Sequence, residues 1–162
     1  MVVREATAGD WDAIFPILAA IVEDGRTYAY PEGLGPDAAR ELWIEPPPGR
    51  CVVATIHGEV CGTAKMGPNR PGRGAHVATG SVMVAPSHQG RGVGRALGRE
   101  VVDWASRAGC RGIQFNAVVA TNLAAVHLWG ELGFEVAGRV PGAFEDRVEG
   151  FVDLLVMYRP VP

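Results

Sequence analysis

The sequence has little of what marks nucleic-acid-binding, membrane-bound or metal-binding proteins. Its net charge is −3, and only Lys65 among the 15 basic residues is a lysine, so no surface for nucleic acid is expected. No apolar run reaches the length of a membrane span. Cys51, Cys61 and Cys110 lack C-x-x-C spacing, which predicts no zinc or other metal site. Met1–Glu5 has no signal-peptide character, so a cytoplasmic protein with reduced thiols is expected.

The most informative feature that is present is the segment from Val82 to Gly94. An apolar stretch, Val82–Val84, is followed by Gly90, Gly92 and Gly94, and then by an amphipathic helical pattern. A strand that passes through glycines into a helix is typical of a phosphate site, because free N–H groups and the helix dipole both favour an anion. Glycine also lets the backbone come close to the ligand. The segment therefore predicts a bound phosphate group.

Hydrophobic periodicity predicts an α/β fold with the element order β-α-α-β-β-β-α-β-α-β-β. The expected strands are Val2–Glu5, Cys51–His57, Val60–Lys65, His76–Val84, Ile113–Val119, Phe134–Val140 and Phe151–Tyr158, with a hairpin turn at Gly58-Glu59. The expected helices begin near Trp11 and span Ala38–Ile44 (capped by Asp37), Val93–Ala108 and Asn122–Leu132. We expect one mixed, partly antiparallel sheet with helices on both faces, in a single domain over residues 1–162.

Two common phosphate loops do not fit the glycine segment. A Walker A loop needs a lysine that is absent here. A Rossmann loop would need glycine where Arg95 stands and would lie near the N-terminus. The remaining pattern, Gln89-x-x-Gly92-x-Gly94, resembles the (Q/R)-x-x-G-x-(G/A) acyl-CoA signature of the GNAT superfamily of N-acetyltransferases.

A second motif and the element order extend this resemblance over nearly the whole chain. The family's N-x-x-A-x-x-L-Y-x-x-x-G-F signature is matched by Asn122, Ala125, Leu128, Gly133 and Phe134. A closer resemblance is to the branch that includes fungal acetyltransferases of proline analogues. It rests on Phe115–Asn122, with Pro68-Asn69 and His76-Val77 upstream. The resemblance implies a splayed sheet of the GNAT type.

The resemblance implies acetyl-CoA (coenzyme A) as the acyl donor. Backbone N–H groups of the glycine loop would hold the pyrophosphate, the strand from Val82 would pair with the pantetheine arm, and an N–H near Val84 would polarise the thioester. Asn122 would bind the pantetheine, and it also fits the N-cap of the next helix; the two roles can coexist. The implied cofactor-binding residues are Val82, Met83, Val84, Gln89, Gly90, Arg91, Gly92, Val93, Gly94, Arg95, Asn122, Ala125 and Trp129.

The acid and the base of the reaction stay open. The family commonly has Tyr where this chain has Trp129, and an indole is no useful acid, so Trp129 is expected to pack along the cofactor. Thiolate protonation is left to water, to the ammonium formed on attack, or to an unidentified residue. The candidate bases are His76, His88, His127, Glu145 and Asp153; none is favoured, and ordinary surface roles fit each of them.

The expected acceptor site is a second set of polar and aromatic residues. By the branch resemblance, Asn69 and Asn116 would bind a substrate carboxylate, and Thr79 would line the same pocket. The implied catalytic residues are Asn116 and Val84, the latter through the N–H near it that would polarise the thioester. Tyr28 and Tyr30 lie in the loop that covers the acceptor side in this fold. The alternatives are that the Asn116 amide only forms hydrogen bonds within the protein, and that the two tyrosines only pack their loop against the core.

The function implied is acetylation of a primary or secondary amine on a small molecule, an amino acid or its analogue, by direct attack on the thioester. Acetylation of a protein or peptide amine, and a weakly catalytic acyl-CoA-binding module, are the alternatives. A homodimer that uses the closing strand Phe151–Tyr158 is also compatible with the resemblance.

Overall fold

Two stretches of consecutive buried residues mark the centre of the sheet. Strand β2 (Arg50–Ile56) is buried from Cys51 to Ala54, and β3 (Glu59–Pro68) is buried along most of its length. A strand buried at consecutive positions is covered on both sides, because successive side chains point to opposite faces. Helices are therefore required on both faces, as the sequence predicts.

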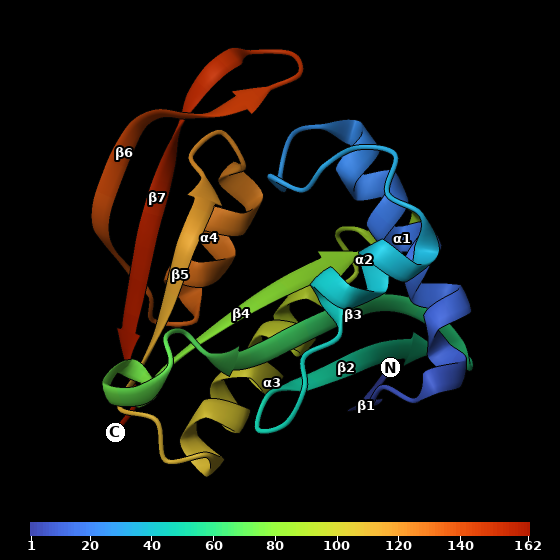
Figure 1. Ribbon diagram of the computed structural model, residues 1–162, viewed down its shortest axis with the longest axis horizontal. Coiled ribbons are helices and arrows are strands. Elements are labelled where there is room, and N and C mark those ends of the chain that lie inside the picture. The colour runs from blue at the N-terminus through green and yellow to red at the C-terminus, as the bar shows by residue number, and fades with distance from the viewer.

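The structure is a computed structural model that describes residues 1–162, and its seven strands form one open sheet (Figure 1). The order across the sheet is β1-β2-β3-β4-β5-β7-β6. The remaining strands are β1 (Val2–Glu5), β4 (Val77–Val84), β5 (Gly112–Val119), β6 (Glu135–Asp146) and β7 (Gly150–Pro160). Only β4 and β5 pair in parallel; all other neighbours are antiparallel. The predicted mixed sheet is confirmed.

Four helices cover the sheet in two pairs. Helices α1 (Trp11–Asp24) and α2 (Pro36–Trp43) lie on one face, and α3 (Val93–Arg107) and α4 (Leu123–Glu131) lie on the other. Strand β2 shows the division, because Val52 belongs to the core beneath α3 whereas Val53 belongs to the core beneath α1. None of the helices is both long and apolar enough to cross a membrane.

Strands β4 and β5 separate after a short parallel contact. Only Val77 with Gly112 and Ala78 with Ile113 are paired, whereas β4 continues beside β3 as far as Val84. The later part of β4 therefore has a free edge toward β5. This splay opens next to the loop that leads into α3.

Two predicted boundaries need correction. The β2–β3 turn is formed by His57 and Gly58, with φ of 51° and 85°, so Glu59 already belongs to β3. Two consecutive positive φ angles are what a tight two-residue hairpin requires. Helix α2 begins at Pro36, so Asp37 lies inside its first turn rather than capping it. Proline suits the first helical position because its missing N–H would be unpaired there anyway.

The outer hairpin is longer than predicted. Strand β6 runs to Asp146 rather than ending at Val140, although Pro141 and Gly142 are strand breakers in most settings. The pairing with β7 shifts register between Val140 and Phe144, so the pair absorbs these residues as an irregularity. The longer hairpin brings its tip beside the α1–α2 connection (Figure 1). All other element boundaries lie within three residues of the prediction.

Candidate active site

The loop between β4 and α3 places its glycines at a helix start. Gly90 and Gly92 have φ of 73° and 80°, a conformation that residues with a Cβ rarely adopt. Gly92 is the N-cap of α3, and its carbonyl accepts from the Ala96 N–H. The N–H groups of the first turn of α3, which come before that of Ala96, have no partner within the helix. They therefore remain available to an anion.

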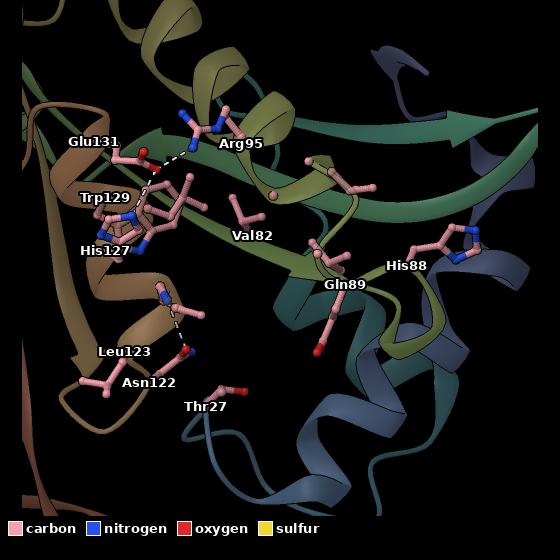
Figure 2. A pocket seen from close by; sticks show the side chains of 18 of the residues that line it. Thr27, Val82, His88, Gln89, Arg95, Asn122, Leu123, His127, Trp129 and Glu131 are labelled. Atoms are coloured by element: carbon pink, nitrogen blue, oxygen red, sulfur yellow. Dashed lines mark hydrogen bonds and ion pairs between the residues drawn. The ribbon is translucent and has the colours of Figure 1, made fainter.

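A cavity of about 800 Å³ lies against this loop and between the starts of α3 and α4; we call it the glycine-loop cavity. Figure 2 shows Gln89 and Asn122 approaching it from different sides. Eleven of the thirteen predicted cofactor residues line it: Val82, Val84, Gln89, Gly90, Gly92, Val93, Gly94, Arg95, Asn122, Ala125 and Trp129. Residues from both sequence signatures therefore share one cavity.

Met83 and Arg91, the other two predicted cofactor residues, do not line this cavity. The Met83 side chain is 1% exposed in the core beneath α1, and Met83 pairs with Thr63 of β3. Neighbouring strand residues point to opposite faces, so the Met83 side chain faces away from the glycine-loop cavity. Met83 instead lines a separate cavity of about 390 Å³, which Val82, Val84 and Gln89 also line. Arg91 is exposed on the surface. The cofactor-binding roles of Met83 and Arg91 therefore stay predictions.

Along the free edge of β4, the backbone N–H and C=O groups of the even-numbered residues face the gap between β4 and β5. Just after β4, the Ala85 N–H donates to the Cys61 carbonyl of β3, so alternation turns the backbone groups of Val82 and Val84 away from β3. At Val82 these groups meet the Tyr28 hydroxyl, which donates to the carbonyl at 2.8 Å and accepts from the N–H at 3.0 Å. Burial raises the pKa of Tyr28 far above its usual value, so the hydroxyl keeps its proton.

Asn122 caps α4. Its Oδ1 accepts a hydrogen bond from the Ala125 N–H at 3.1 Å, drawn in Figure 2. The predicted capping role is therefore confirmed. The same side chain lies on the wall of the glycine-loop cavity, so a structural role and a ligand contact are compatible in position.

A second cavity, of about 260 Å³, lies between the diverging strands β4 and β5; we call it the splay cavity. Tyr28, Tyr30, Thr79 and Asn116, four of the five predicted substrate residues, line it. The fifth, Asn69, lies outside the lining, but the Asn116 Nδ2 donates to the Asn69 Oδ1 at 2.6 Å. The predicted acceptor residues are thus gathered in one place.

Gln114 and Thr27 were missed by sequence reasoning. The Gln114 Nε2 donates to the Asn116 Oδ1 at 2.8 Å, which fixes the orientation of the Asn116 amide. The two residues are two positions apart on β5 and so share one face of the strand; that spacing was the available signal. Thr27 lines both cavities, and nothing in its sequence context marks it.

The two cavities adjoin along a common wall. Val82, Asn122, Ala125 and Trp129 line both of them. A group held against the glycine loop and a small molecule in the splay cavity would therefore meet at this wall. The geometry suits transfer of a group from one ligand to the other.

Trp129 forms the rigid part of the common wall. It is 7% exposed, and its ring lies 4.6 Å from that of Phe115 and edge-on to that of Phe134 at 5.8 Å. Gly98 of α3 allows this packing, because a Cβ there would lie 2.8 Å from a Trp129 ring carbon. The indole is a fixed apolar surface along both cavities.

None of the five candidate bases lines the splay cavity, whose ionisable groups are the phenols of Tyr28 and Tyr30. His76 and Glu145 are exposed, and Asp153 pairs with an arginine at 2.7 Å. The other candidates, His88 and His127, line the glycine-loop cavity instead. The lining of the splay cavity itself therefore offers neither carboxylate nor imidazole. Glu145 instead lines another cavity, which shares Tyr28 and Tyr30 with the splay cavity.

An ion pair crosses the mouth of the glycine-loop cavity. Arg95 Nη2 of α3 lies 2.5 Å from Glu131 Oε2 of α4, and His127 lies 3.7 Å from the same oxygen (Figure 2). Arg95 therefore links the two helices and lies beside the loop that would hold a phosphate. This position is compatible both with the ion pair to Glu131 and with the predicted contact to a coenzyme A phosphate.

The fold and the two adjoining cavities fit an enzyme that transfers a group between two ligands, and comparison with known proteins identifies the family. The family model described as Acetyltransferase (GNAT) family matches residues 13–134. The chain belongs to this family, as the two signatures predict. It is an acetyl-CoA-dependent N-acyltransferase.

Solved structures support the same conclusion over the whole chain. A GCN5-related N-acetyltransferase from Kribbella flavida is 54% identical with a TM-score of 0.95, over 98% of this chain and 96% of that one. The yncA protein of Salmonella typhimurium, solved with its cofactor acetyl-CoA, is 27% identical with a TM-score of 0.86, over 100% and 94% of the two chains.

Two curated relatives carry more specific names. N-acetyltransferase aca1 of Schizosaccharomyces pombe is 39% identical over 90 residues, which are 55% of this chain and 43% of aca1; the chain thus spans less than half of that fungal relative. The L-methionine sulfoximine/L-methionine sulfone acetyltransferase of Salmonella typhimurium is 31% identical over 148 residues, 87% of this chain and 84% of that protein.

Proposed function

We propose that this protein acetylates the primary or secondary amine of a small molecule, an amino acid or an amino-acid analogue. The observation that carries the proposal is the common wall of the two cavities at Val82, Asn122 and Trp129. The glycine-loop cavity has room for a long anionic donor, whereas the splay cavity, at about 260 Å³, suits a small acceptor. The Salmonella relative named for two methionine analogues supports an acceptor of this class.

The residues of the glycine-loop cavity would bind acetyl-CoA with its phosphates at the start of α3 and its thioester at Val84. Unpaired N–H groups at the start of α3 would hold the pyrophosphate. The pantetheine arm would meet the free edge of β4 at Val84, where the strand ends, because Tyr28 occupies that edge at Val82. The Val84 N–H would polarise the thioester carbonyl; loss of such a donor in other enzymes costs about 3 kcal/mol. Acetyl-CoA supplies a thioester, so the amine nitrogen bonds to the carbonyl carbon, the carbon–sulfur bond breaks, and the proton lost by nitrogen ends on sulfur.

Asn116 is the proposed contact for the acceptor. Its amide lies in the splay cavity and is oriented by Gln114 and Asn69 on either side, at 2.8 and 2.6 Å. An amide held in this way can hydrogen-bond a carboxylate next to the reacting amine. Since no carboxylate or imidazole lines the splay cavity, the amine would enter in its neutral form, having lost its proton to water.

A thiol-release assay over a panel of amino acids, proline analogues and methionine analogues tests the proposal. We expect at least one acceptor to raise CoA release well above the hydrolysis rate. Asn116→Ala should then raise the acceptor KM about tenfold, the loss of one hydrogen bond, with an unchanged affinity for acetyl-CoA.

Three results of this assay contradict the proposal in different ways. Tight acetyl-CoA binding without any acceptor would indicate a binding module. Turnover confined to peptides would indicate a protein-modifying enzyme. An unchanged KM in Asn116→Ala would remove Asn116 from the acceptor site.

Replacing Asn122 separates its two roles. Asn122→Ser keeps a side-chain oxygen that can cap α4, whereas Asn122→Ala removes the cap at a cost of about 1 kcal/mol. If the amide also binds pantetheine, both variants should raise the KM for acetyl-CoA about tenfold, and only Asn122→Ala should lower the thermal midpoint. A wild-type KM in Asn122→Ser would limit Asn122 to capping.

Three expectations from the sequence stay predictions. The single-domain organisation rests on the one continuous sheet. A cytoplasmic location is supported by three free cysteines, two of them buried. A homodimer is supported by the outer position of β6 and by Phe151, which is 76% exposed on β7.

A further inference from the structure

Tyr28 contacts β4 at the point where this strand passes from the glycine-loop cavity to the splay cavity. Its hydroxyl bonds both the N–H and the carbonyl of Val82, at 3.0 and 2.8 Å. Tyr28 also lines the splay cavity together with Thr79 and Gly80, farther from the glycine loop along β4. The backbone groups of Val84, two residues nearer that loop, face the splay with no neighbouring strand. Tyr28 therefore blocks the free edge of β4 partway along its length.

The ring of Tyr28 is fixed by its neighbours. It lies 5.5 Å from the ring of Tyr30 and meets the ring of Trp43 edge-on at 6.3 Å. Trp43 is fully buried and its Nε1 donates to the Thr63 Oγ1 at 3.0 Å. Because close-packed interiors resist displacement, the Tyr28 ring cannot swing away without disturbing the core beneath α2.

The segment that carries Tyr28 is held by contacts both before and after this residue in the sequence. The Arg147 N–H, at the tip of the β6–β7 hairpin, donates to the Gly25 carbonyl at 3.1 Å. The Arg147 guanidinium pairs with Glu32. These contacts lie before and after Tyr28 in the sequence, so the hairpin tip holds the whole connection against the site.

We propose that Tyr28 sets the length of the acyl group and restricts the donor to acetyl. The inference rests on the proposed function, in which the pantetheine arm comes from the glycine loop and meets the free edge of β4 at Val84, where the strand ends. With the thioester at Val84, an acyl chain that continues along the strand meets the Tyr28 hydroxyl at Val82. A longer chain must break two hydrogen bonds or move a packed ring. A site without room for one extra methylene typically discriminates by about 10–200-fold.

Calorimetric binding without any acceptor tests this role. The dissociation constants of CoA, acetyl-CoA and butyryl-CoA are measured for the wild type and for Tyr28→Ala. We expect the wild type to bind butyryl-CoA at least about tenfold more weakly than acetyl-CoA, and Tyr28→Ala to bring the two within about threefold. CoA itself, which has no acyl group, should bind both proteins equally and so reports on folding and on the glycine loop.

Two further variants keep the test decisive. Tyr30→Ala removes the neighbouring ring but no hydrogen bond to β4, so the preference for acetyl-CoA should persist. If Tyr28→Ala does not fold, Tyr28→Leu shortens the side chain while keeping an apolar group against Trp43. An unchanged acetyl preference in a folded Tyr28 variant with normal CoA binding overturns the role of Tyr28 alone. Failure of the wild type to bind acetyl-CoA instead contradicts the proposed function.

Discussion

Gly92→Val is expected to weaken acetyl-CoA binding by about 100-fold or more, equivalent to roughly 2.8 kcal/mol. Gly92 has φ of 80°, and a Cβ on it would meet nothing within 4 Å, because it would project into open space at the loop. Valine there would occupy space that the pyrophosphate needs and would also strain the left-handed backbone by about 1–2 kcal/mol. Titration calorimetry with acetyl-CoA measures the loss.

Gly109→Val is the matched control for this experiment. Gly109 follows the opposite end of α3 and has φ of 71°, and a Cβ on it would likewise meet nothing within 4 Å. It does not line the glycine-loop cavity. Both variants should therefore lose similar stability, but only Gly92→Val should lose acetyl-CoA. Equal affinities in the two variants would refute the phosphate-binding role of the glycine loop.

Trp129→Ala is expected to lower the free energy of unfolding by about 3–5 kcal/mol, the usual loss for a buried large aromatic. The ring of Trp129 packs against Phe115 and fits beside Gly98, so its removal leaves a void between α4, α3 and β5. Because the same ring walls both cavities, acetyl transfer should also be lost. Chemical denaturation and the thiol-release assay measure the two effects.

Trp129→Phe separates packing from acid catalysis. Phenylalanine keeps an aromatic ring against Phe115 but has no N–H. Since an indole is not a useful acid, we expect kcat to stay within about tenfold of the wild type, a change of about 1.4 kcal/mol or less in the barrier. A fall in kcat of about a hundredfold or more, with stability retained, would show that the indole N–H takes a direct part in the reaction.

The element order and the glycine loop could be predicted from the sequence because both depend on local patterns. Apolar periodicity identifies each helix and strand, and the glycines before Val93 set the start of α3 whatever the rest of the chain does. The helical pattern after Asn122, together with the preference of asparagine for helix starts, likewise predicted this residue as an N-cap. These features need no information about distant partners.

The contacts that complete the site could not be predicted because they join distant segments. The Tyr28 hydroxyl reaches Val82, 54 positions away, and Asn116 reaches Asn69, 47 positions away. The branch resemblance already groups Asn69 with Asn116 in the acceptor site, but no spacing in the sequence identifies either hydrogen bond. The absence of Met83 from the glycine-loop cavity could be expected from the sequence, because strand alternation turns its side chain away from that of Val82.

The length of β6 shows a different limit. Pro141 and Gly142 stop most strands, but here the register shift between Val140 and Phe144 accommodates them. The extended hairpin then reaches Gly25 and stabilises the connection that carries Tyr28. A local breaker signal was overridden by pairing with β7, which sequence reasoning on β6 alone could not take into account.

A structure determined with acetyl-CoA would show whether the donor runs from the glycine loop to the free edge of β4 at Val84 and on toward the common wall. We expect pyrophosphate oxygens about 3 Å from the N–H groups at the start of α3. We also expect the acetyl group to lie between Val84 and an undisplaced Tyr28. Coenzyme phosphates bound away from the Gly90–Arg95 loop, or a thioester that does not reach Val84, would contradict this arrangement.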